Sequence, residues 1–113
     1  MADGALVRVE PDSGTEGVTH VVLDRPAALN AISTDLAAQL ADVLAELATD
    51  DALRAVVLSS SNPKAFCVGA DLKERDGYSD AQLRAQRVVY RRMAAALLAV
   101  PVPVVAAVAG YAL

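Results

Sequence analysis

Short apolar runs alternate along this chain with two longer stretches of helical periodicity, and this alternation restricts the possible folds more than any other feature. The runs are rich in Val and other β-branched residues, which is typical of strands. Residues 11–14 (Pro-Asp-Ser-Gly) have the composition of a turn, so the first two runs are expected to form a hairpin. We predict four strands, over residues 6–10, 17–24, 54–60 and 104–108.

The two helical stretches differ in how they begin. Leu and Val residues between positions 36 and 47 fall on one face of a helix that Ser33 or Thr34 can cap and that ends near Asp50. The second helix begins with a capping box at residues 79–82 and continues to about Val100. Its predicted core face consists of Leu83, Tyr90, Met93 and Leu97.

The order strand, strand, helix, strand, loop, helix, strand predicts an α/β fold with right-handed crossovers and a mainly parallel sheet. Residues 55–58 are continuously apolar, so we expect helices to cover both faces of that strand. No repeat or linker divides residues 1–113, which we interpret as part of one domain. The apolar residues 107–113 predict that the sequence is one portion of a longer chain.

Composition and charge exclude several classes of site and partner. A net charge of −4 and a pI near 4.7 argue against a general nucleic-acid binder. One cysteine, Cys67, and one histidine, His20, can build neither a disulfide nor a Cys/His zinc site, so no metal is expected. Residues 1–5 do not resemble a signal peptide, and no apolar run could span a membrane. These features predict a soluble protein of a reducing cytoplasm.

A turn at Val68-Gly69-Ala70 is the most informative local feature. Gly69 allows a backbone conformation or a close approach that other residues resist. Residues 71–74 can form one helical turn, whose first amides have no partner within the helix. Two such amides directed at one oxygen form an oxyanion hole. On the residues alone, a purely structural turn is the commoner meaning of a glycine that follows a strand.

Three blocks of sequence carry a resemblance to a known family. They are residues 23–31 (Leu-Asp-Arg-Pro-Ala-Ala-Leu-Asn-Ala), 66–75 (Phe-Cys-Val-Gly-Ala-Asp-Leu-Lys-Glu-Arg) and 101–113 (Pro-Val-Pro-Val-Val-Ala-Ala-Val-Ala-Gly-Tyr-Ala-Leu). In order and spacing they resemble the crotonase superfamily of enoyl-CoA hydratases and isomerases, and the similarity covers nearly all of the chain after about Val18. The resemblance implies a crotonase-like spiral of ββα units, of which residues 1–113 are the N-terminal part.

The resemblance also implies a binding site. In the family, the amide of the alanine that matches Ala70 is one of two donors to the thioester oxygen of an acyl-CoA. The second donor and the catalytic glutamates follow the segment that ends here at Leu113. Many members have lysine where this chain has Ala27, so one charge toward the nucleotide is missing. The residues implied to contact coenzyme A are Ala27, Ala28, Asn30, Val68, Gly69, Ala70, Asp71, Leu72 and Lys73. Lys73 matches a lysine near the coenzyme A phosphates, with a solvated surface lysine as the alternative.

The implied activity is hydration of a 2-enoyl-CoA through an enolate that the oxyanion hole stabilises. Coenzyme A is part of the substrate, so no separate cofactor is expected. Two alternatives stay open: an enoyl-CoA isomerase of the same family, and an inactive remnant that binds coenzyme A or a partner. The resemblance further implies a homo-oligomer, either a trimer or a pair of trimers.

The remaining polar and apolar features are interpreted structurally. We expect Cys67 to be a small buried residue and His20 a strand residue that faces solvent or a backbone partner. Asp71 and Glu74 could serve as acid or base, but a helix cap explains Asp71 better. Residues 104–108 should expose an apolar face in this chain alone, which predicts poor solubility. We expect a basic, solvated helix face formed by Arg84, Arg87, Arg91 and Arg92. The alternatives are that this face contacts the coenzyme A phosphates, another subunit or RNA.

Overall fold

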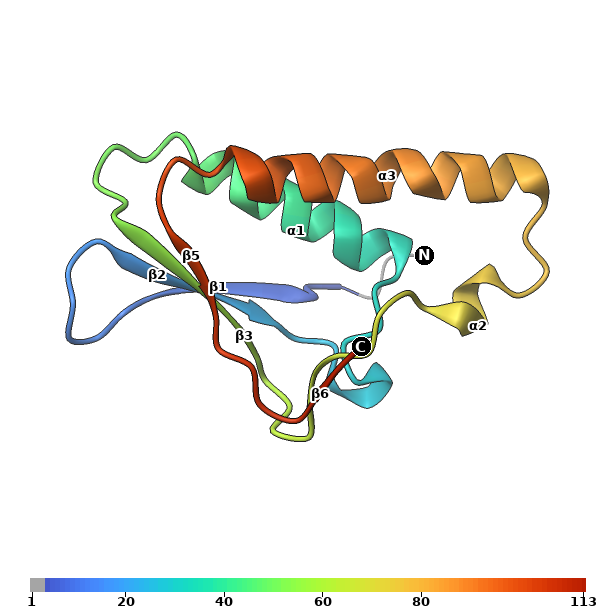
Figure 1. The fold of residues 1–113 in the computed structure, drawn as a ribbon, viewed down its shortest axis with the longest axis horizontal. Coiled ribbons are helices and arrows are strands. Elements are labelled where there is room, and N and C mark those ends of the chain that lie inside the picture. The colour runs from blue at the N-terminus through green and yellow to red at the C-terminus, as the bar shows by residue number, and fades with distance from the viewer. Residues whose placement is uncertain (1–3) are drawn as a thin grey trace.

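Four strands form the main sheet in the computed structural model, which describes residues 4–113 (Figure 1). The strands are β1 (Val7–Pro11), β2 (Val18–Leu23), β3 (Ala55–Ser60) and β5 (Val104–Ala106). They lie in the order β1, β2, β3, β5. The β1 and β2 strands pair antiparallel, whereas β2 with β3 and β3 with β5 pair parallel. The predicted hairpin and the mainly parallel sheet are therefore confirmed.

Local capping chemistry starts both long helices where the sequence predicts. The helices are α1 (Thr34–Leu47) and α3 (Asp80–Ala99). The Leu36 amide donates to the Ser33 hydroxyl oxygen over 3.1 Å, which makes Ser33 the cap of α1. Ser79 and Gln82 form the predicted capping box, with reciprocal bonds of 2.8 and 3.1 Å. The α1 helix ends three residues earlier than expected, at Leu47.

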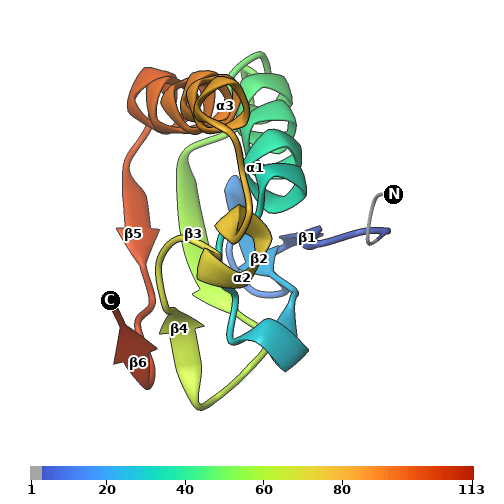
Figure 2. The same cartoon turned by 90° about the vertical axis from the view of Figure 1, so that its right-hand side faces the viewer.

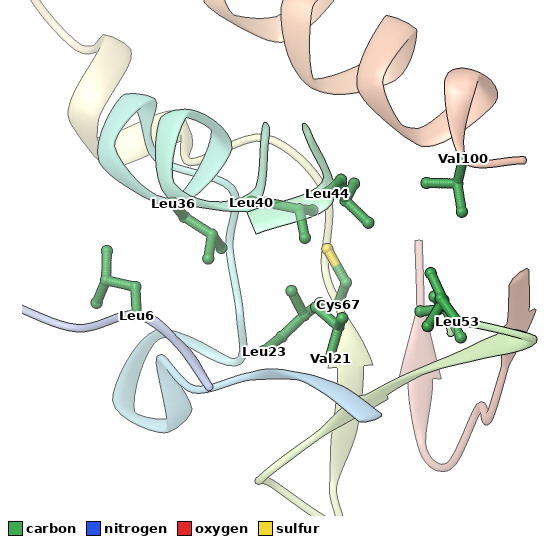
Figure 3. Close-up of a cluster of buried hydrophobic side chains, with 10 residues drawn as sticks. Leu6, Val21, Leu23, Leu36, Leu40, Leu44, Leu53, Cys67 and Val100 are labelled. Atoms are coloured by element: carbon green, nitrogen blue, oxygen red, sulfur yellow. The ribbon is translucent and has the colours of Figure 1, made fainter. Parts of the chain in front are cut away.

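Both long helices lie on the same face of the main sheet (Figures 1 and 2). Leucines of α1 point toward Val21 and Leu23 of β2, and these side chains form the centre of the core (Figure 3). The prediction that helices cover both faces of β3 is wrong for the described residues, because Val57 on its second face is only half-buried. The reason is topological. The parallel strands are added in one direction across the sheet, and right-handed crossovers then place every connecting helix on one face.

Two very short strands form a second sheet that the sequence did not reveal. Strand β4 (Ala65–Cys67) pairs parallel with β6 (Tyr111–Ala112), at the end of the molecule away from the long helices (Figure 2). Gly110 precedes β6 with a φ of 76°, and a Cβ there would run into the Lys64 carbonyl group. Only glycine lets the two segments approach this closely. The pairing brings the end of the chain beside the turn at residues 68–70, where the Leu113 amide donates to the Cys67 carbonyl oxygen over 3.0 Å.

The α3 helix packs on α1 through a partly buried face and leaves its basic face in solvent. The predicted core residues Leu83, Tyr90, Met93 and Leu97 are half-buried. Arg84, Arg87 and Arg91 are exposed, as the solvated interpretation and its alternatives all require, so the interpretation stays a prediction for these three. Arg92 differs because its guanidinium lies 3.0 Å from the Asp42 carboxylate and 3.0 Å from the Ala38 carbonyl oxygen, both on α1.

The predicted apolar exposure after α3 is confirmed, since Val105 and Val108 are 56% and 54% exposed. Poor solubility of this chain alone stays a prediction. Across residues 4–113, none of the helices has the length and apolar character needed to cross a membrane. The first three residues, on which part of the signal-peptide interpretation depends, lie outside the described residues.

Candidate functional site

The peptide backbone around Ala70 is held from one side by Ile32, with which it forms an isolated parallel bridge. The Ile32 amide donates to the Gly69 carbonyl oxygen over 2.7 Å, and the Asp71 amide donates to the Ile32 carbonyl oxygen over 3.1 Å. The Gly69 carbonyl and the Ala70 N–H belong to one planar peptide unit and point in opposite directions. The Ala70 N–H is therefore directed away from Ile32, and no bond within residues 4–113 uses it.

Ala70 lies at the junction of two cavities. A cavity of about 270 Å³ is lined by Ala28, Ala31, Val68, Ala70, Asp71, Leu72 and Lys73. A second, of about 220 Å³, is lined by Ile32, Ala70, Tyr90 and Met93. The first has charged groups on its wall, whereas the lining of the second is mainly apolar. A ligand that occupied both would pass the Ala70 backbone at their shared wall.

Gly69 permits the bend that presents the Ala70 amide. Its φ is 90°, in a region that favours glycine, and an added Cβ would lie 3.5 Å from the Leu113 carbonyl oxygen. Strain in the backbone, more than lack of space, therefore requires glycine at this position. Val68, on the other side of Gly69, lines the larger cavity.

The Asp71 carboxylate anchors the turn from behind. One of its oxygens accepts the Lys73 and Glu74 amides, each over 3.1 Å, and so caps the short helix α2 (Leu72–Arg75). The other accepts a bond of 2.7 Å from the Arg25 guanidinium. Burial alone raises the pKa of Asp71, but the bonds from Arg25 and Glu74 and the charge of Arg25 outweigh it, so the pKa lies below its usual value. The cap predicted for Asp71 is confirmed.

Asn30 is fully buried, behind the cavity wall. Its side-chain oxygen accepts the Arg25 amide over 2.8 Å, and its side-chain nitrogen donates to the Ser60 hydroxyl oxygen and the Phe66 carbonyl oxygen over 2.6 and 3.0 Å. Both Asn30 and Leu29 have left-handed backbone conformations, with φ of 56° and 53°. Asn30 thus ties the loop after β2 to β3 and β4, and it lines neither cavity.

Of the other residues implied to contact coenzyme A, some line a cavity and some do not. Ala28 lines the larger cavity, whereas Ala27 is exposed and lines neither cavity. Both belong to η1 (Pro26–Ala28), the short helical turn after β2. Leu72 and Lys73 are exposed at the rim of the larger cavity. Six of the nine residues therefore line the larger cavity, Gly69 lies within the Ala70 turn, Ala27 lies outside both cavities, and Asn30 supports the loop from inside.

The residues interpreted as structural are engaged within the fold. Cys67 is buried, and its thiol lies 3.2 Å from the Asn30 carbonyl oxygen, which confirms its interpretation. His20 lies 2.7 Å from the Asp12 carboxylate, so its partner is a side chain and not the expected solvent or backbone group. The hydrogen bond from His20 lowers the pKa of Asp12. No cluster within residues 4–113 has the three His, Cys, Asp or Glu side chains needed to hold a metal ion.

Glu74 is held in place by polar contacts from two helices. One oxygen of its carboxylate accepts the Thr34 amide, the Thr34 hydroxyl and the Gln86 amide nitrogen, over 2.9, 2.8 and 2.7 Å. Gln86 is also the buried residue of α3. Through these contacts α2 is bound to the start of α1 and to the first half of α3. They give Glu74 a structural role whether or not it also moves protons.

Ile32, Tyr90 and Met93 are site residues that reasoning from the sequence did not identify. Tyr90 and Met93 were expected on the core face of α3: Met93 does pack against the core, but both residues also line the smaller cavity. Periodicity shows that residues share a helix face and does not show whether a core or a cavity lies opposite that face. To assign these residues to the site, one must know that α3 lies near the Ala70 turn. That proximity depends on tertiary contacts, which the local sequence does not show.

The profile of the enoyl-CoA hydratase/isomerase family matches residues 13–113. This chain belongs to that family. The chain is 39% identical over 122 residues to the enoyl-CoA isomerase/hydratase fer4 of Mycosarcoma maydis, covering 100% of the chain and 44% of that protein. It is 36% identical over 98 residues to the mitochondrial enoyl-CoA hydratase domain-containing protein 2 of Mus musculus, covering 87% of the chain and 33% of that protein.

A solved structure of an enoyl-CoA hydratase from Bacillus anthracis has the same crotonase fold. The TM-score is 0.85 at 33% identity, and the match covers 94% of this chain and 40% of that chain. This family member therefore corresponds to the N-terminal part of the crotonase fold. It spans less than half the length of the relatives it matches.

Proposed function

We propose that the full-length protein acts on acyl-CoA thioesters and that the Ala70 N–H donates a hydrogen bond to the thioester carbonyl oxygen. The observation that supports this most directly is the Ala70 N–H at the junction of two cavities, which has no partner among residues 4–113. An amide that is already oriented stabilises negative charge on the carbonyl oxygen without reorganisation during the reaction. Family membership supplies the substrate class.

The two cavities suit the two parts of such a substrate. In this proposal the larger cavity takes the coenzyme A part, with the exposed Lys73 at its rim available to a phosphate group. The smaller cavity, between Ile32, Tyr90 and Met93, takes the part of the acyl chain next to the carbonyl. The thioester carbonyl would then lie beside Ala70, which lines both.

The proposed reaction is hydration of a 2-enoyl-CoA. The hydroxyl group of water adds to the β-carbon, electrons move toward the thioester oxygen, and the α-carbon of the resulting enolate then takes a proton. Ala70 would stabilise the enolate oxygen, with a second backbone donor and proton-transferring glutamates from chain beyond residue 113. When a double bond moves from the 3- to the 2-position, removal of the α-proton gives a dienolate whose thioester oxygen needs the same stabilisation. An isomerase activity is therefore the second candidate, and the word isomerase in the name of fer4 favours testing it.

Hydration of crotonyl-CoA by the full-length protein tests the proposal. Ala70→Pro removes the N–H and is expected to lower kcat by about 10²- to 10³-fold, as loss of one oxyanion donor does. Asp80→Pro is the matched control because Asp80 is the exposed first residue of α3, where proline is tolerated, and Ser79 before it is extended. An Ala70→Pro variant as active as Asp80→Pro would refute the role of the Ala70 N–H, and a wild-type protein without hydratase activity would refute the hydration reaction.

Two further measurements separate the alternatives. Formation of 2-enoyl-CoA from a 3-enoyl-CoA identifies an isomerase, whereas binding of coenzyme A without either reaction identifies an inactive remnant. We also propose that the full-length protein is a cytoplasmic trimer or pair of trimers. Sedimentation velocity of the full-length protein checks the oligomeric state, and a monomer would contradict it.

A further inference from the structure

The hydroxyl group of Tyr90 contacts the backbone that orients the Ala70 amide. It donates a hydrogen bond of 2.6 Å to the Ile32 carbonyl oxygen. The same oxygen accepts the Asp71 amide over 3.1 Å, and the Ile32 amide holds the Gly69 carbonyl oxygen over 2.7 Å. Ile32 therefore holds the peptide units on both sides of Ala70, and Tyr90 holds Ile32 from α3.

The position of Tyr90 makes this contact well defined. Burial, followed by the negative charge of Glu74, raises the pKa of Tyr90, so the hydroxyl stays protonated at neutral pH and acts as a donor. One helical turn earlier, Gln86 donates to the Glu74 carboxylate over 2.7 Å and to the Thr34 hydroxyl over 3.0 Å. These bonds fix the same face of α3 against the segments that follow Ile32 and Ala70.

Besides donating through its hydroxyl group, Tyr90 lines the smaller cavity together with Ile32, Ala70 and Met93. A substitution that keeps the ring and removes only the oxygen therefore preserves most of this side chain in the lining. This property separates an effect on backbone orientation from an effect on the shape of the cavity.

We propose that Tyr90 is a positioning residue that fixes the direction of the Ala70 N–H through the Ile32 carbonyl group. Its role in catalysis depends on the proposed function, but its effect on the backbone does not. The Ile32 carbonyl oxygen keeps the Asp71 amide as a donor when Tyr90→Phe removes the hydroxyl. The variant is therefore expected to fold, with a less strictly held Ala70 peptide.

The test compares Tyr90→Phe with Tyr78→Phe in the full-length protein. Tyr78 is half-buried, lies outside the lining of both cavities, and its hydroxyl makes no hydrogen bond within residues 4–113. Without substrate, we measure amide hydrogen exchange at Asp71 and, as a reference, at Val56 in the core, whose amide donates to the Pro103 carbonyl oxygen. With crotonyl-CoA, we measure kcat and KM separately.

Tyr90→Phe is expected to speed exchange at Asp71 by about five- to tenfold with no change at Val56. It should lower kcat by about tenfold, with KM within about twofold of wild type, because only an interaction that strengthens in the transition state is weakened. Tyr78→Phe should change neither quantity. Unchanged exchange at Asp71, or a raised KM with unchanged kcat, would overturn the positioning role. If the wild-type protein proves inactive while exchange at Asp71 responds, the proposed function fails and the positioning role is retained.

Discussion

Replacement of Asn30 by alanine tests how the loop that supports the site is held in place. Asn30 is fully buried, and its side chain makes three hydrogen bonds, one to the Arg25 amide, one to Ser60 and one to the Phe66 carbonyl oxygen. Truncation leaves the Arg25 amide and the Phe66 carbonyl without these partners in a part-buried region. It also leaves alanine with a φ of 56°, a conformation that asparagine tolerates better.

These losses set the expected magnitude. The three part-buried hydrogen bonds of this fully buried side chain contribute about 1 kcal/mol each, and alanine in the left-handed conformation costs about 1 kcal/mol more. Asn30→Ala should therefore lower the free energy of unfolding of the full-length protein by about 4 kcal/mol. Urea denaturation followed by circular dichroism measures the change, with the slope of the transition expected to stay constant.

Asn62→Ala provides the matched control. Asn62 donates to the Pro26 carbonyl oxygen over 3.1 Å and accepts the Lys64 amide over 2.9 Å, but both bonds are exposed. Water can replace them, so the loss should be below about 1 kcal/mol. Equal effects of the two substitutions would refute the view that burial makes the Asn30 contacts important.

Two further predictions concern the turn and the second sheet. Hydrogen bonds from Arg25 and Glu74 hold the pKa of Asp71 in the folded protein below its value in the unfolded chain. The stability that Asp71 contributes is therefore present above the unfolded-state pKa and is lost as pH falls through the folded-state pKa. Asp71→Asn should lower the unfolding temperature at neutral pH, and the difference from wild type should shrink below about pH 4; a difference that does not vary with pH contradicts this. Gly110→Ala should disrupt the pairing of β4 with β6, since the new Cβ meets the Lys64 carbonyl group. Gly14→Ala is the control, because its φ is ordinary and its Cβ would make only a van der Waals contact of 3.8 Å with the Asp12 side chain; it should change stability by less than about 0.5 kcal/mol in the same thermal melts.

Elements set by local chemistry could be predicted from the sequence, and those set by distant contacts could not. The Ser79–Gln82 capping box and the leucine face of α1 depend on neighbouring residues, so both were predicted correctly. Strands β4 and β6 have three and two residues, too few to show a period, and each exists through pairing with the other. The prediction that helices cover both faces of β3 was wrong because a continuous apolar run indicates that a strand is buried. It does not indicate which elements pack on each of its faces.

The same distinction applies to the site. The Val68-Gly69-Ala70 turn and the Asp71 cap could be identified from residue types. After a strand, glycine usually forms a turn, and an aspartate before a helical turn usually caps it. The burial of Asn30 could not, since nothing in the neighbouring residues shows that β3 and β4 enclose it. Tyr90 was assigned to a core face for a similar reason. Its role follows from a contact with Ile32, which lies 58 positions away in the sequence.

The central claim is that the Ala70 N–H binds the thioester carbonyl oxygen. Infrared spectroscopy of a bound acyl-CoA with a ¹³C-labelled thioester carbonyl tests it most directly, because the carbonyl stretching frequency falls when the oxygen accepts a hydrogen bond. The full-length protein would be compared with a version in which lactic acid replaces Ala70, so that an ester oxygen takes the place of this single N–H. We predict a lowered frequency in the wild-type complex and partial return toward the solution value in the ester variant; identical bands in the two complexes would contradict the claim.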